Sequence, residues 1–403
     1  MSSPAAETTF EVNTQSPKPN LRIAFIGGRG VVSKYSGIET YYEEVGGRLA
    51  EMGHSVSAYC RSYFTPELKH YRGIRIVRLP TIRTRSLETL FHTWLSTLHA
   101  LRGNCEIVHY HCLGPALFSF LPRLFGKKTV VTVQGLDWQR KKWGRIASTV
   151  LRAGEWAASQ FPNTTIVVSK TLQKHYLNRH GDNTVYVPNG TSLKEKTSAG
   201  HLSKWGLTPG GYILFLGRFS PEKNCHLLIQ AYEKLDTSVK LVLAGGSSHR
   251  DEYLHHLRRH QSERILLLDW QRGDALDELL TNAMLFVLPS DLEGMSLALL
   301  EAMGAGVCTL ASDIPENREV LGDAGFTFQA GNGNDLERML RLLIFTASLR
   351  TKAAAEGRKR VQERFLWNRV ANQMEGVYLQ LVEASHTDLS SKAFKPVSTR
   401  RAA

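Results

Sequence analysis

The chain has 403 residues, of which 42% are hydrophobic and 22% charged, which is typical of a globular protein too long for a single hydrophobic core. A formal net charge of +13 favours anionic partners such as nucleic acid, anionic lipid or phosphorylated small molecules. No apolar run approaches the roughly 20 residues that span a bilayer, and the five scattered cysteines form no CxxC pair and no zinc spacing. We therefore expect two domains, no transmembrane helix and a reducing, cytoplasmic location.

Both ends of the chain have the composition of disordered tails. Residues 1–20 are rich in Ser, Thr, Pro and Ala, and residues 385–403 are similar with several added cations. The N-terminal segment lacks the charged-then-apolar pattern of a secretory signal, which also favours the cytoplasm. Neither a zinc-finger spacing nor an aromatic RNA-binding strand is found, so we do not expect nucleic acid as the main ligand.

Between the tails, short aliphatic or β-branched runs alternate with helix-length segments, starting with LRIAFIGG. Such runs of four to six residues predict parallel strands buried on both faces. A polar stretch at residues 191–211 interrupts the alternation, which restarts with YILFLG. We predict an α/β fold of two Rossmann-like, doubly wound domains, residues 21–195 and 196–365, facing a central cleft. A final helix, residues 366–384, is expected to pack back on the first domain.

The first predicted strand runs into the Gly-rich segment GGRGVVSKYSGIET. Its glycines leave room for a backbone to approach phosphate, and Gly37 begins a predicted helix. Gly28 and Gly30 also match the start of a dinucleotide-binding turn. However, Ser33 stands at the third glycine position, and the second strand ends in Arg61 rather than in an acid for ribose. This pattern weighs against NAD binding.

Further polar residues lie on or just after predicted strands of the first domain. The HYH sequence places His109 and His111 on one face of a strand. His111, nearer the strand end, is either a cleft residue or a hydrogen-bonded core histidine, and the sequence leaves both open. After VVTV comes Gln134, which can donate a hydrogen bond but cannot titrate, and then Asp137, a candidate binding carboxylate.

The segment after Asp137 interleaves aromatic rings with cations. A basic and aromatic surface suits an anionic membrane, where each cation contributes on the order of 1 kcal/mol. We therefore predict peripheral membrane contact; the alternative is a solvated helix face with the tryptophans in the core. The residues concerned are Trp138, Arg140, Lys141, Lys142, Trp143 and Arg145, with Arg83 and Arg85 in the preceding helical region.

In the second domain, LFLGRFSPEKN leaves a buried strand for a loop that carries Arg218 and Lys223. An arginine offers a planar fork and a lysine a compact point charge, so the pair is a plausible clamp for the two phosphates of a nucleotide. The alternative is that both are surface cations beside Glu222.

The most informative segment is residues 284–307, where a strand, a short loop and a helix carry two carboxylates eight residues apart. Glu293 lies at the expected helix start near Gly294, where the amides of Gly294, Met295 and Ser296 can receive an anion or a hydroxyl. Glu301 lies two turns into the helix and suits the vicinal hydroxyls of a ribose. The alternative is a loop Glu followed by a helix with one exposed Glu.

These features together resemble the retaining glycosyltransferases of family 4 (glycosyltransferases group 1), which have the GT-B fold. The resemblance rests on the Glu293 to Glu301 spacing, the GRFSPEKN loop and the opening Gly-rich turn, and it spans residues 21–382. It implies that Arg218 and Lys223 hold the donor diphosphate, that Glu301 binds the ribose and that Glu293 binds the transferring sugar.

The resemblance also assigns roles to the donor and acceptor sides of the first domain. It implies that Gly28 and Gly37 approach the donor pyrophosphate, with Gly294, Met295 and Ser296 completing the donor site. His111, Gln134 and Asp137 become candidates for the acceptor or sugar side. Gln134 stands where relatives often have His, and Ser192, after the Asn189-Gly190 turn, stands where many have Asp.

The expected activity is transfer of a hexosyl unit from a nucleotide-diphosphate sugar to a saccharide or lipid-linked acceptor, with retention of configuration, in surface polysaccharide or glycolipid synthesis. Arg218, Lys223 and Glu293 are the expected catalytic residues, since fixed cations stabilise the charge that grows on the leaving phosphate. Although Asp291 and Glu293 resemble a metal-binding D-x-D motif, we expect no metal and no cofactor. The alternatives are a nucleotide-sugar epimerase or hydrolase on this fold, or a non-catalytic sugar-nucleotide-binding scaffold.

Overall fold

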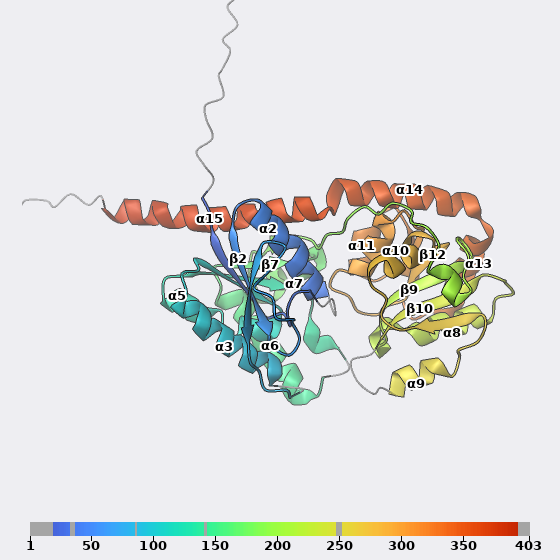
Figure 1. Cartoon of the computed structure of the whole chain (residues 1–403), viewed down its shortest axis with the longest axis horizontal. Coiled ribbons are helices and arrows are strands. Elements are labelled where there is room, and N and C mark those ends of the chain that lie inside the picture. The colour runs from blue at the N-terminus through green and yellow to red at the C-terminus, as the bar shows by residue number, and fades with distance from the viewer. Residues whose placement is uncertain (1–18, 33–36, 85–86, 141–142, 247–251, 394–403) are drawn as a thin grey trace, which may run out of the picture.

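Two parallel sheets, each flanked by helices, lie side by side and are spanned by two C-terminal helices (Figure 1). The computed structural model describes residues 19–32, 37–84, 87–140, 143–246 and 252–393, with side chains up to residue 383. Every strand pair is parallel except one, at the edge of the first sheet. The predicted α/β class with two Rossmann-like domains is confirmed.

The first sheet has the strand order β3-β4-β2-β1-β5-β6-β7-β8. Its strands are β1 (Arg22–Ile26), β2 (Ser55–Arg61), β3 (His70–Tyr71), β4 (Ile74–Leu79), β5 (Ile107–His111), β6 (Lys128–Val133), β7 (Thr164–Val167) and β8 (Val185–Tyr186). Its helices are α1 (Gly37–Tyr41), the π-helical turn η1 (Tyr42–Gly46), α2 (Gly47–Glu51), α3 (Glu88–Arg102), α4 (Leu113–Ala116), α5 (Phe120–Leu124), η2 (Asp137–Gln139), α6 (Arg145–Gln160) and α7 (Lys170–His180).

The second sheet has the order β11-β10-β9-β12-β13-β14. Its strands are β9 (Tyr212–Arg218), β10 (Lys240–Gly246), β11 (Ile265–Leu268), β12 (Leu285–Leu288), β13 (Thr309–Ser312) and β14 (Phe326–Phe328). Its helices are η3 (Leu202–Trp205), η4 (Pro221–Lys223), α8 (Cys225–Glu233), α9 (Glu252–Arg258), α10 (Gly273–Thr281), α11 (Leu297–Gly304), α12 (Pro315–Leu321), α13 (Gly333–Phe345) and α14 (Ala347–Arg364), followed by α15 (Trp367–Ala393).

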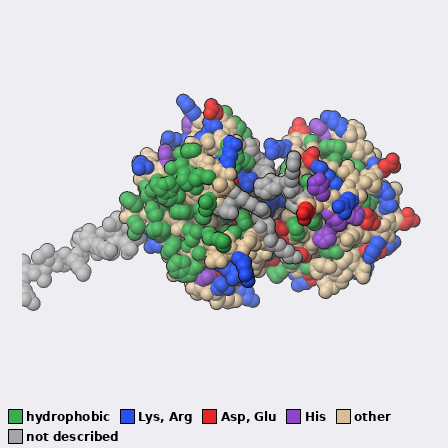
Figure 2. Space-filling view, turned by 90° about the horizontal axis from the view of Figure 1, so that it is seen from below, with side chains coloured by type: hydrophobic (Ala, Val, Ile, Leu, Met, Phe, Trp, Pro, Cys, Tyr) green, Lys and Arg blue, Asp and Glu red, His purple; other side chains and the backbone are tan. Residues whose placement is uncertain are grey.

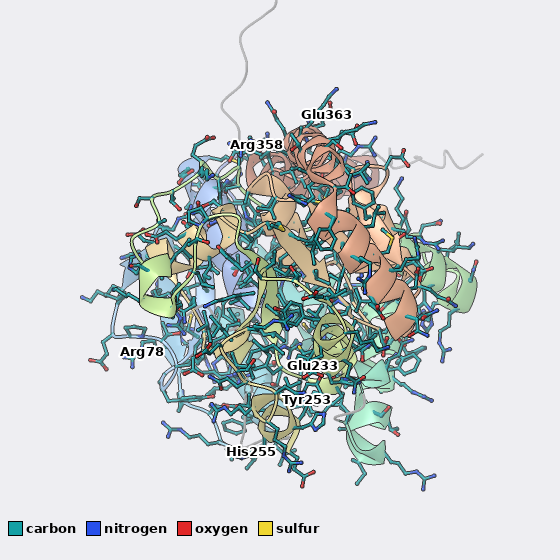
Figure 3. The ribbon with its side chains drawn as sticks, turned by 90° about the vertical axis from the view of Figure 1, so that its right-hand side faces the viewer. Arg78, Glu233, Tyr253, His255, Arg358 and Glu363 are labelled. Carbon is teal, nitrogen blue, oxygen red and sulfur yellow. The ribbon has the colours of Figure 1, made fainter. Side chains whose placement is uncertain are left out.

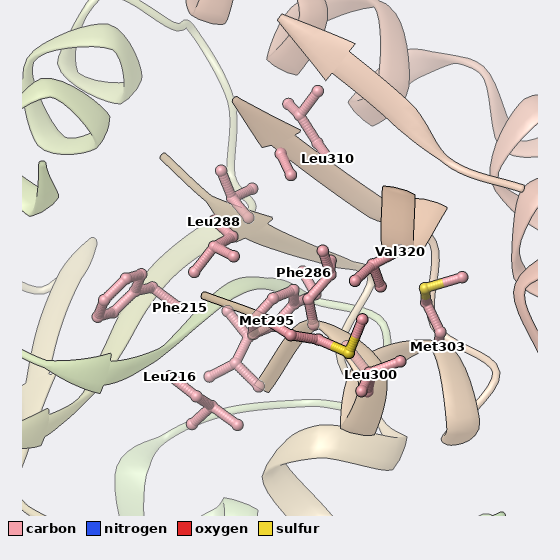
Figure 4. Close-up of a cluster of buried hydrophobic side chains, with 14 of the residues drawn as sticks. Phe215, Leu216, Phe286, Leu288, Met295, Leu300, Met303, Leu310 and Val320 are labelled. Carbon is pink, nitrogen blue, oxygen red and sulfur yellow. The ribbon is translucent and has the colours of Figure 1, made fainter. Parts of the chain in front are cut away.

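The core of the second domain holds β9 and β12 side by side. Phe215 on β9, Phe286 on β12 and Leu300 on α11 are fully buried in one apolar cluster (Figure 4). Burying each such side chain contributes roughly 1.5–3 kcal/mol. Because β9 and β12 are parallel neighbours, the loops that follow them leave the same edge of the sheet. That edge carries the charged residues discussed below.

The C-terminal helices tie the two domains together. Arg358 on α14, labelled in Figure 3, donates to the carbonyl oxygen of Lys194 at 2.5 Å and to that of Gly304 at 3.1 Å. The chain then crosses back beside Thr191, which pairs with Leu366. The connection after the first domain is therefore fastened to the second.

Helix α15 lies on the first domain. His109 Nδ1 lies 2.6 Å from the Tyr378 hydroxyl, and His54 Nε2 lies 3.2 Å from Glu375 Oε1. The helix continues to Ala393, so residues 385–393, expected as part of a disordered tail, are helical. A helix that is already nucleated gains a hydrogen bond for each residue added, which extends it beyond its apolar stretch. Among the described residues, no helix is both long and apolar enough to cross a membrane.

Candidate functional site

The two domains touch where the loop after β6 meets the loop after β12. A Cβ on Gly294 would lie 1.7 Å from the carbonyl oxygen of Gln134, so only glycine permits this contact. Nearby, Asn189 Nδ2 donates to Gln134 Oε1 at 3.2 Å and to the Met295 carbonyl oxygen at 3.3 Å. At the other end of the contact, a Cβ on Gly37 would lie 3.0 Å from Leu297.

The three predicted catalytic residues converge beside this contact. Arg218 is the last residue of β9, Lys223 ends η4, and Glu293 follows β12. Lys223 Nζ forms an ion pair with Glu293 Oε1, and both side chains are largely buried. Glu293 is also one of the charged groups that act electrostatically on Arg218. Two adjacent strands thus deliver two cations and a carboxylate to one place.

The side chain of Arg218 has no hydrogen bond or ion pair with any residue in the described part of the chain. Burial, and after it the nearby guanidinium of Arg140, lower the pKa of Arg218 below its ordinary value, while Glu222, Asp137 and Glu293 act in the opposite sense. A largely buried cation without a hydrogen-bonded partner is costly. This arrangement suits an anionic ligand.

The helix with the second carboxylate begins later than predicted. It starts at Leu297, with Ser296 as N-cap, because the Ser296 hydroxyl accepts from the Leu299 amide at 3.4 Å and serine is a favoured capping residue. No acceptor among the described residues takes the backbone amides of Gly294, Met295 and Ser296. These amides precede the first turn of α11 instead of lying within it. Glu301 lies on the same helix and is half-buried.

The amides of the Gly-rich turn are bound within the first domain. Gly28 donates to the Tyr42 hydroxyl at 2.9 Å, and Val32 donates to Glu43 Oε1 at 2.8 Å. Tyr42 and Glu43 belong to the π-helical turn η1. A phosphate could accept from the Gly28 amide only if this hydrogen bond were exchanged. The glycines in the sequence predict that a ligand could approach the backbone closely here. They do not predict that the Tyr42 and Glu43 side chains accept hydrogen bonds from the amides of this turn.

His111 is a core residue in this structure, which corrects its assignment to the acceptor side. Its side chain is fully buried against the rings of Phe25, Tyr41, Tyr42 and His109. Burial, followed by the proximity of His109, lowers the pKa of His111 well below its ordinary value. A saccharide cannot reach a side chain with no exposed surface. Strand alternation alone could not distinguish this buried position from one lining the cleft.

The other two acceptor-side candidates lie at the contact between the domains. Gln134 Nε2 is buried and has no hydrogen-bond acceptor among the described residues, so it is available as a donor. Asp137 Oδ1 lies 2.9 Å from Arg140 Nε, and Arg140 Nη1 lies 3.9 Å from Glu222 Oε1 in the other domain. The sequence interpretation missed Arg140 here, having placed it on a membrane surface. The sequence feature that could have identified Arg140 is its spacing of three residues from Asp137, in the loop that follows the buried strand β6.

Trp138 also turns inward rather than towards a membrane. Its Nε1 donates to Glu155 Oε2 at 2.6 Å, and Glu155 is almost fully buried. The other oxygen, Oε1, lies 2.7 Å from His175 Nε2 and 3.0 Å from His180 Nε2. These three groups could hold a metal ion, a possibility that the sequence interpretation did not raise. Because the Arg179 guanidinium lies 3.3 Å from the same oxygen, the cluster is explained by ion pairing and anchors the loop that carries Asp137.

Comparisons with known proteins match both domains. Residues 35–195 match the family model described as Glycosyltransferase Family 4, and residues 204–360 match the model described as Glycosyl transferases group 1. One model therefore matches the first domain and the other matches the second.

Individual relatives extend over most of the chain. The N-acetyl-alpha-D-glucosaminyl L-malate synthase of Bacillus anthracis is 24% identical over 89% of this chain and 95% of that protein. The phosphatidyl-myo-inositol mannosyltransferase of Mycobacterium leprae is 26% identical over 74% of this chain and 77% of that protein. The O-antigen chain mannosyltransferase B of Escherichia coli is 31% identical, but the match covers 44% of this chain and 48% of that protein.

Solved structures share the fold at low identity. Sucrose-phosphate synthase from Thermosynechococcus elongatus superposes with a TM-score of 0.78 at 22% identity, covering 91% of this chain and all of that one. The Anabaena protein HepE in complex with UDP-glucose gives a TM-score of 0.75 at 17% identity, with 91% of this chain and all of that chain covered.

Proposed function

The chain belongs to the GT-B glycosyltransferases of group 1, family 4, and we propose that it moves a hexosyl unit from a nucleoside-diphosphate donor to a saccharide or lipid-linked acceptor with retention of configuration. The observation that carries this proposal is the convergence of Arg218, Lys223 and Glu293 at the contact between the domains. A donor with a diphosphate at one end and a sugar at the other matches that grouping of cations and carboxylate.

In the proposed reaction, the bond between the anomeric carbon and the diphosphate oxygen breaks, and negative charge grows on that oxygen. Arg218 and Lys223 stabilise the charge more in the transition state than in the ground state. The acceptor hydroxyl forms the new glycosidic bond on the face that the diphosphate leaves, and its proton passes to a phosphate oxygen. Glu293 orients sugar hydroxyls, so no covalent sugar intermediate and no glycosidase-type carboxylate pair are needed.

Two of the relatives' names support the saccharide and lipid acceptor classes, and a third names a small hydroxy acid. One relative is named for L-malate as the acceptor of a glucosaminyl group, another for phosphatidyl-myo-inositol and a third for an O-antigen chain. A role in surface polysaccharide or glycolipid synthesis at the cytoplasmic face of a membrane is consistent with the latter two. The donor base is left to experiment, since the grouped charges contact parts common to many nucleotide sugars.

A thermal-shift panel of UDP-, GDP- and ADP-sugars tests the donor class. A ligand at about 100 times its dissociation constant stabilises the folded state by about 2.7 kcal/mol. The donor so identified is then incubated with acceptors, and the anomeric configuration of the product is read by NMR. Inverted product would contradict the proposed stereochemistry, and no shift with any nucleotide sugar would contradict the donor class.

The same assay separates the two competing functions. A nucleotide-sugar epimerase or hydrolase changes the donor when no acceptor is present, so its product appears in the acceptor-free control. A non-catalytic scaffold binds the donor and transfers it to no acceptor. The proposed enzyme instead consumes the donor in step with a glycosylated acceptor.

We also propose that the first domain contacts an anionic membrane through an apolar face rather than through the loop at Trp138. Hydrophobic side chains gather over one side of that lobe (Figure 2). In and next to α5 and α6, the exposed apolar side chains include Ile146 at 84%, Leu124 at 75%, Phe125 at 64% and Trp156 at 51%. The exposed cations Arg123, Arg145 and Arg152 lie on the same helices, α5 and α6. Apolar residues among cations match an interface of anionic lipid.

Co-sedimentation with vesicles tests the membrane contact. Wild type should bind vesicles containing phosphatidylglycerol more strongly than pure phosphatidylcholine, and added salt should weaken the difference. The double variant Leu124→Ser, Phe125→Ser should lose binding, while Leu342→Ser, on an exposed position of α13 in the other domain, should not. Equal binding by both variants would remove this face from the proposal. Lys141, Lys142 and Arg85, which the sequence placed in the membrane surface, lie outside the described residues.

A further inference from the structure

Arg140 is a cation of the first domain that lies against the donor loop of the second. It follows η2 in the loop between β6 and α6. Its Nε lies 2.9 Å from Asp137 Oδ1, and its Nη1 lies 3.9 Å from Glu222 Oε1. Glu222 immediately precedes Lys223 and is buried, with no hydrogen bond to Oε1 among the described residues. Arg140 therefore joins the two domains at the proposed phosphate site.

Asp137 holds the guanidinium of Arg140 in place. Burial alone would lower the pKa of Arg140, but the carboxylates of Asp137, Glu293 and Glu222 outweigh burial and raise it above its ordinary value. Asp137 lies next to Nε of the guanidinium, while Nη1 points towards Glu222 in the second domain. Arg140 Nε is buried without a hydrogen-bond acceptor among the described residues, so the ion pair with Asp137 positions a guanidinium that still has N–H groups for an oxyanion.

Arg140 and Arg218 are like charges brought together from opposite domains. Arg140 acts electrostatically on Arg218 in a partly buried setting, and the Arg218 side chain makes no hydrogen bond or ion pair with a described residue. Two guanidinium groups near each other repel unless an anion is shared between them. The loop geometry, with the backbone of Gly294 against that of Gln134, keeps them together.

We propose that Arg140 binds the donor diphosphate from the first domain, opposite Arg218, so that the phosphates link the two domains. This inference rests on the proposed function, because it names a further residue of the same donor site. In this proposal Arg140 is part of the donor-binding site. Its loop is held in place by two contacts, the ion pair of Asp137 with Arg140 and the hydrogen bond of Trp138 to Glu155.

Calorimetric titration with UDP, GDP and ADP identifies the nucleoside diphosphate that wild type binds, and that diphosphate and its monophosphate are the probes. Losing one charge-assisted hydrogen bond should weaken diphosphate binding by about 10- to 100-fold in Arg140→Ala. The monophosphate should lose less, because it presents fewer oxygens. Arg140→Lys should recover part of the loss. Arg341→Ala, at an exposed cation of α13, is the matched control and should bind as wild type does.

The outcomes separate this inference from the function on which it rests. If wild type binds no nucleoside diphosphate, or if Arg218→Ala binds as wild type does, the proposed donor site is wrong. If Arg218→Ala weakens binding but Arg140→Ala and Arg140→Lys do not, only the assignment of Arg140 fails. Thermal unfolding of each variant without nucleotide checks that it folds. Should Arg140→Ala unfold, Arg140→Lys and Asp137→Asn carry the test, and unchanged diphosphate affinity in both would overturn the assignment.

Discussion

Lys223 and Glu293 form an ion pair that joins the loop after β9 to the loop after β12. In the proposed reaction these two residues serve different parts of one donor, the diphosphate and the sugar. Donor binding must therefore exchange the contact between them for contacts with the substrate. This makes the two residues energetically coupled, and their substitutions should not be additive.

Lys223→Ala should lower kcat by roughly 10²–10³-fold, by analogy with the loss of one transition-state donor. Glu293→Gln should also lower kcat, and the double variant should lose less than the product of the two single effects. Steady-state kinetics of wild type, the two single variants and the double variant measures this coupling. Lys234→Ala, at the C-cap of α8 where the lysine side chain is 54% exposed, is the control and should leave kcat unchanged. Independent, multiplicative effects would argue against a shared donor.

Glu301→Gln should mainly weaken donor binding, because its proposed partners are ribose hydroxyls that do not change during transfer. Loss of a hydrogen bond to a charged group corresponds to about a 10- to 100-fold weaker affinity. Calorimetry with the nucleoside diphosphate measures it, and Glu337→Gln on α13 is the matched control. A fall in kcat with unchanged affinity would place Glu301 in the chemical step instead.

Gly294→Ala should reduce turnover while leaving each domain folded. The new methyl group would lie 1.7 Å from the Gln134 carbonyl oxygen, so the two loops must separate. A displacement of about 1 Å at an active site can reduce the rate on the order of 100-fold. Gly144→Ala, where an added Cβ meets nothing within 4 Å and φ is −70°, controls for the substitution itself. Wild-type kcat/KM in Gly294→Ala would show that catalysis does not need this contact.

Turnover should survive EDTA, because in the proposed donor site Arg218 and Lys223 already supply positive charge to the diphosphate. Asp291 is exposed, and its amide donates to the Glu222 carbonyl oxygen at 2.9 Å. We expect the same initial rate with and without chelator and no gain from manganese. Loss of activity in EDTA that manganese restores would mean that Asp291 and Glu293 bind a catalytic metal.

Acid should destabilise the fold through His109. This side chain is fully buried between Tyr378 and Thr132, and burial lowers its pKa from 6.5 to about 3. Below pH 6.5 the unfolded chain takes up a proton that the folded chain does not, so stability is lost as the pH falls from 6.5 towards 3. The slope from one such group is at most about 1.4 kcal/mol per pH unit.

Urea unfolding of wild type and His109→Gln between pH 7 and pH 4 measures this contribution. Glutamine can hydrogen-bond but cannot titrate, so the variant should show a shallower pH dependence. Some dependence should persist, since burial also lowers the pKa of His111 well below its ordinary value and that of His92 to about 4. Parallel pH curves for the two proteins would contradict a role for His109.

Two features of the molecule followed from the sequence alone. Alternating apolar runs predicted two parallel α/β domains, and the same runs placed Arg218, Lys223 and Glu293 just after strands. Parallel strands of one sheet end at the same edge, so the pattern indicated that these residues share an edge. Only the structure shows that β9 and β12 are neighbours.

The tertiary structure alone decided where Arg140, Trp138 and His111 lie. Arg140 reaches Glu222 in the other domain, Trp138 turns onto Glu155, and His111 is enclosed by aromatic rings. Whether a polar side chain faces solvent, the core or a neighbouring domain depends on packing between segments distant in the chain. Local periodicity does not identify those distant partners. The loop of Trp138 and Arg140 therefore has the composition of a membrane surface but lies at the contact between the domains.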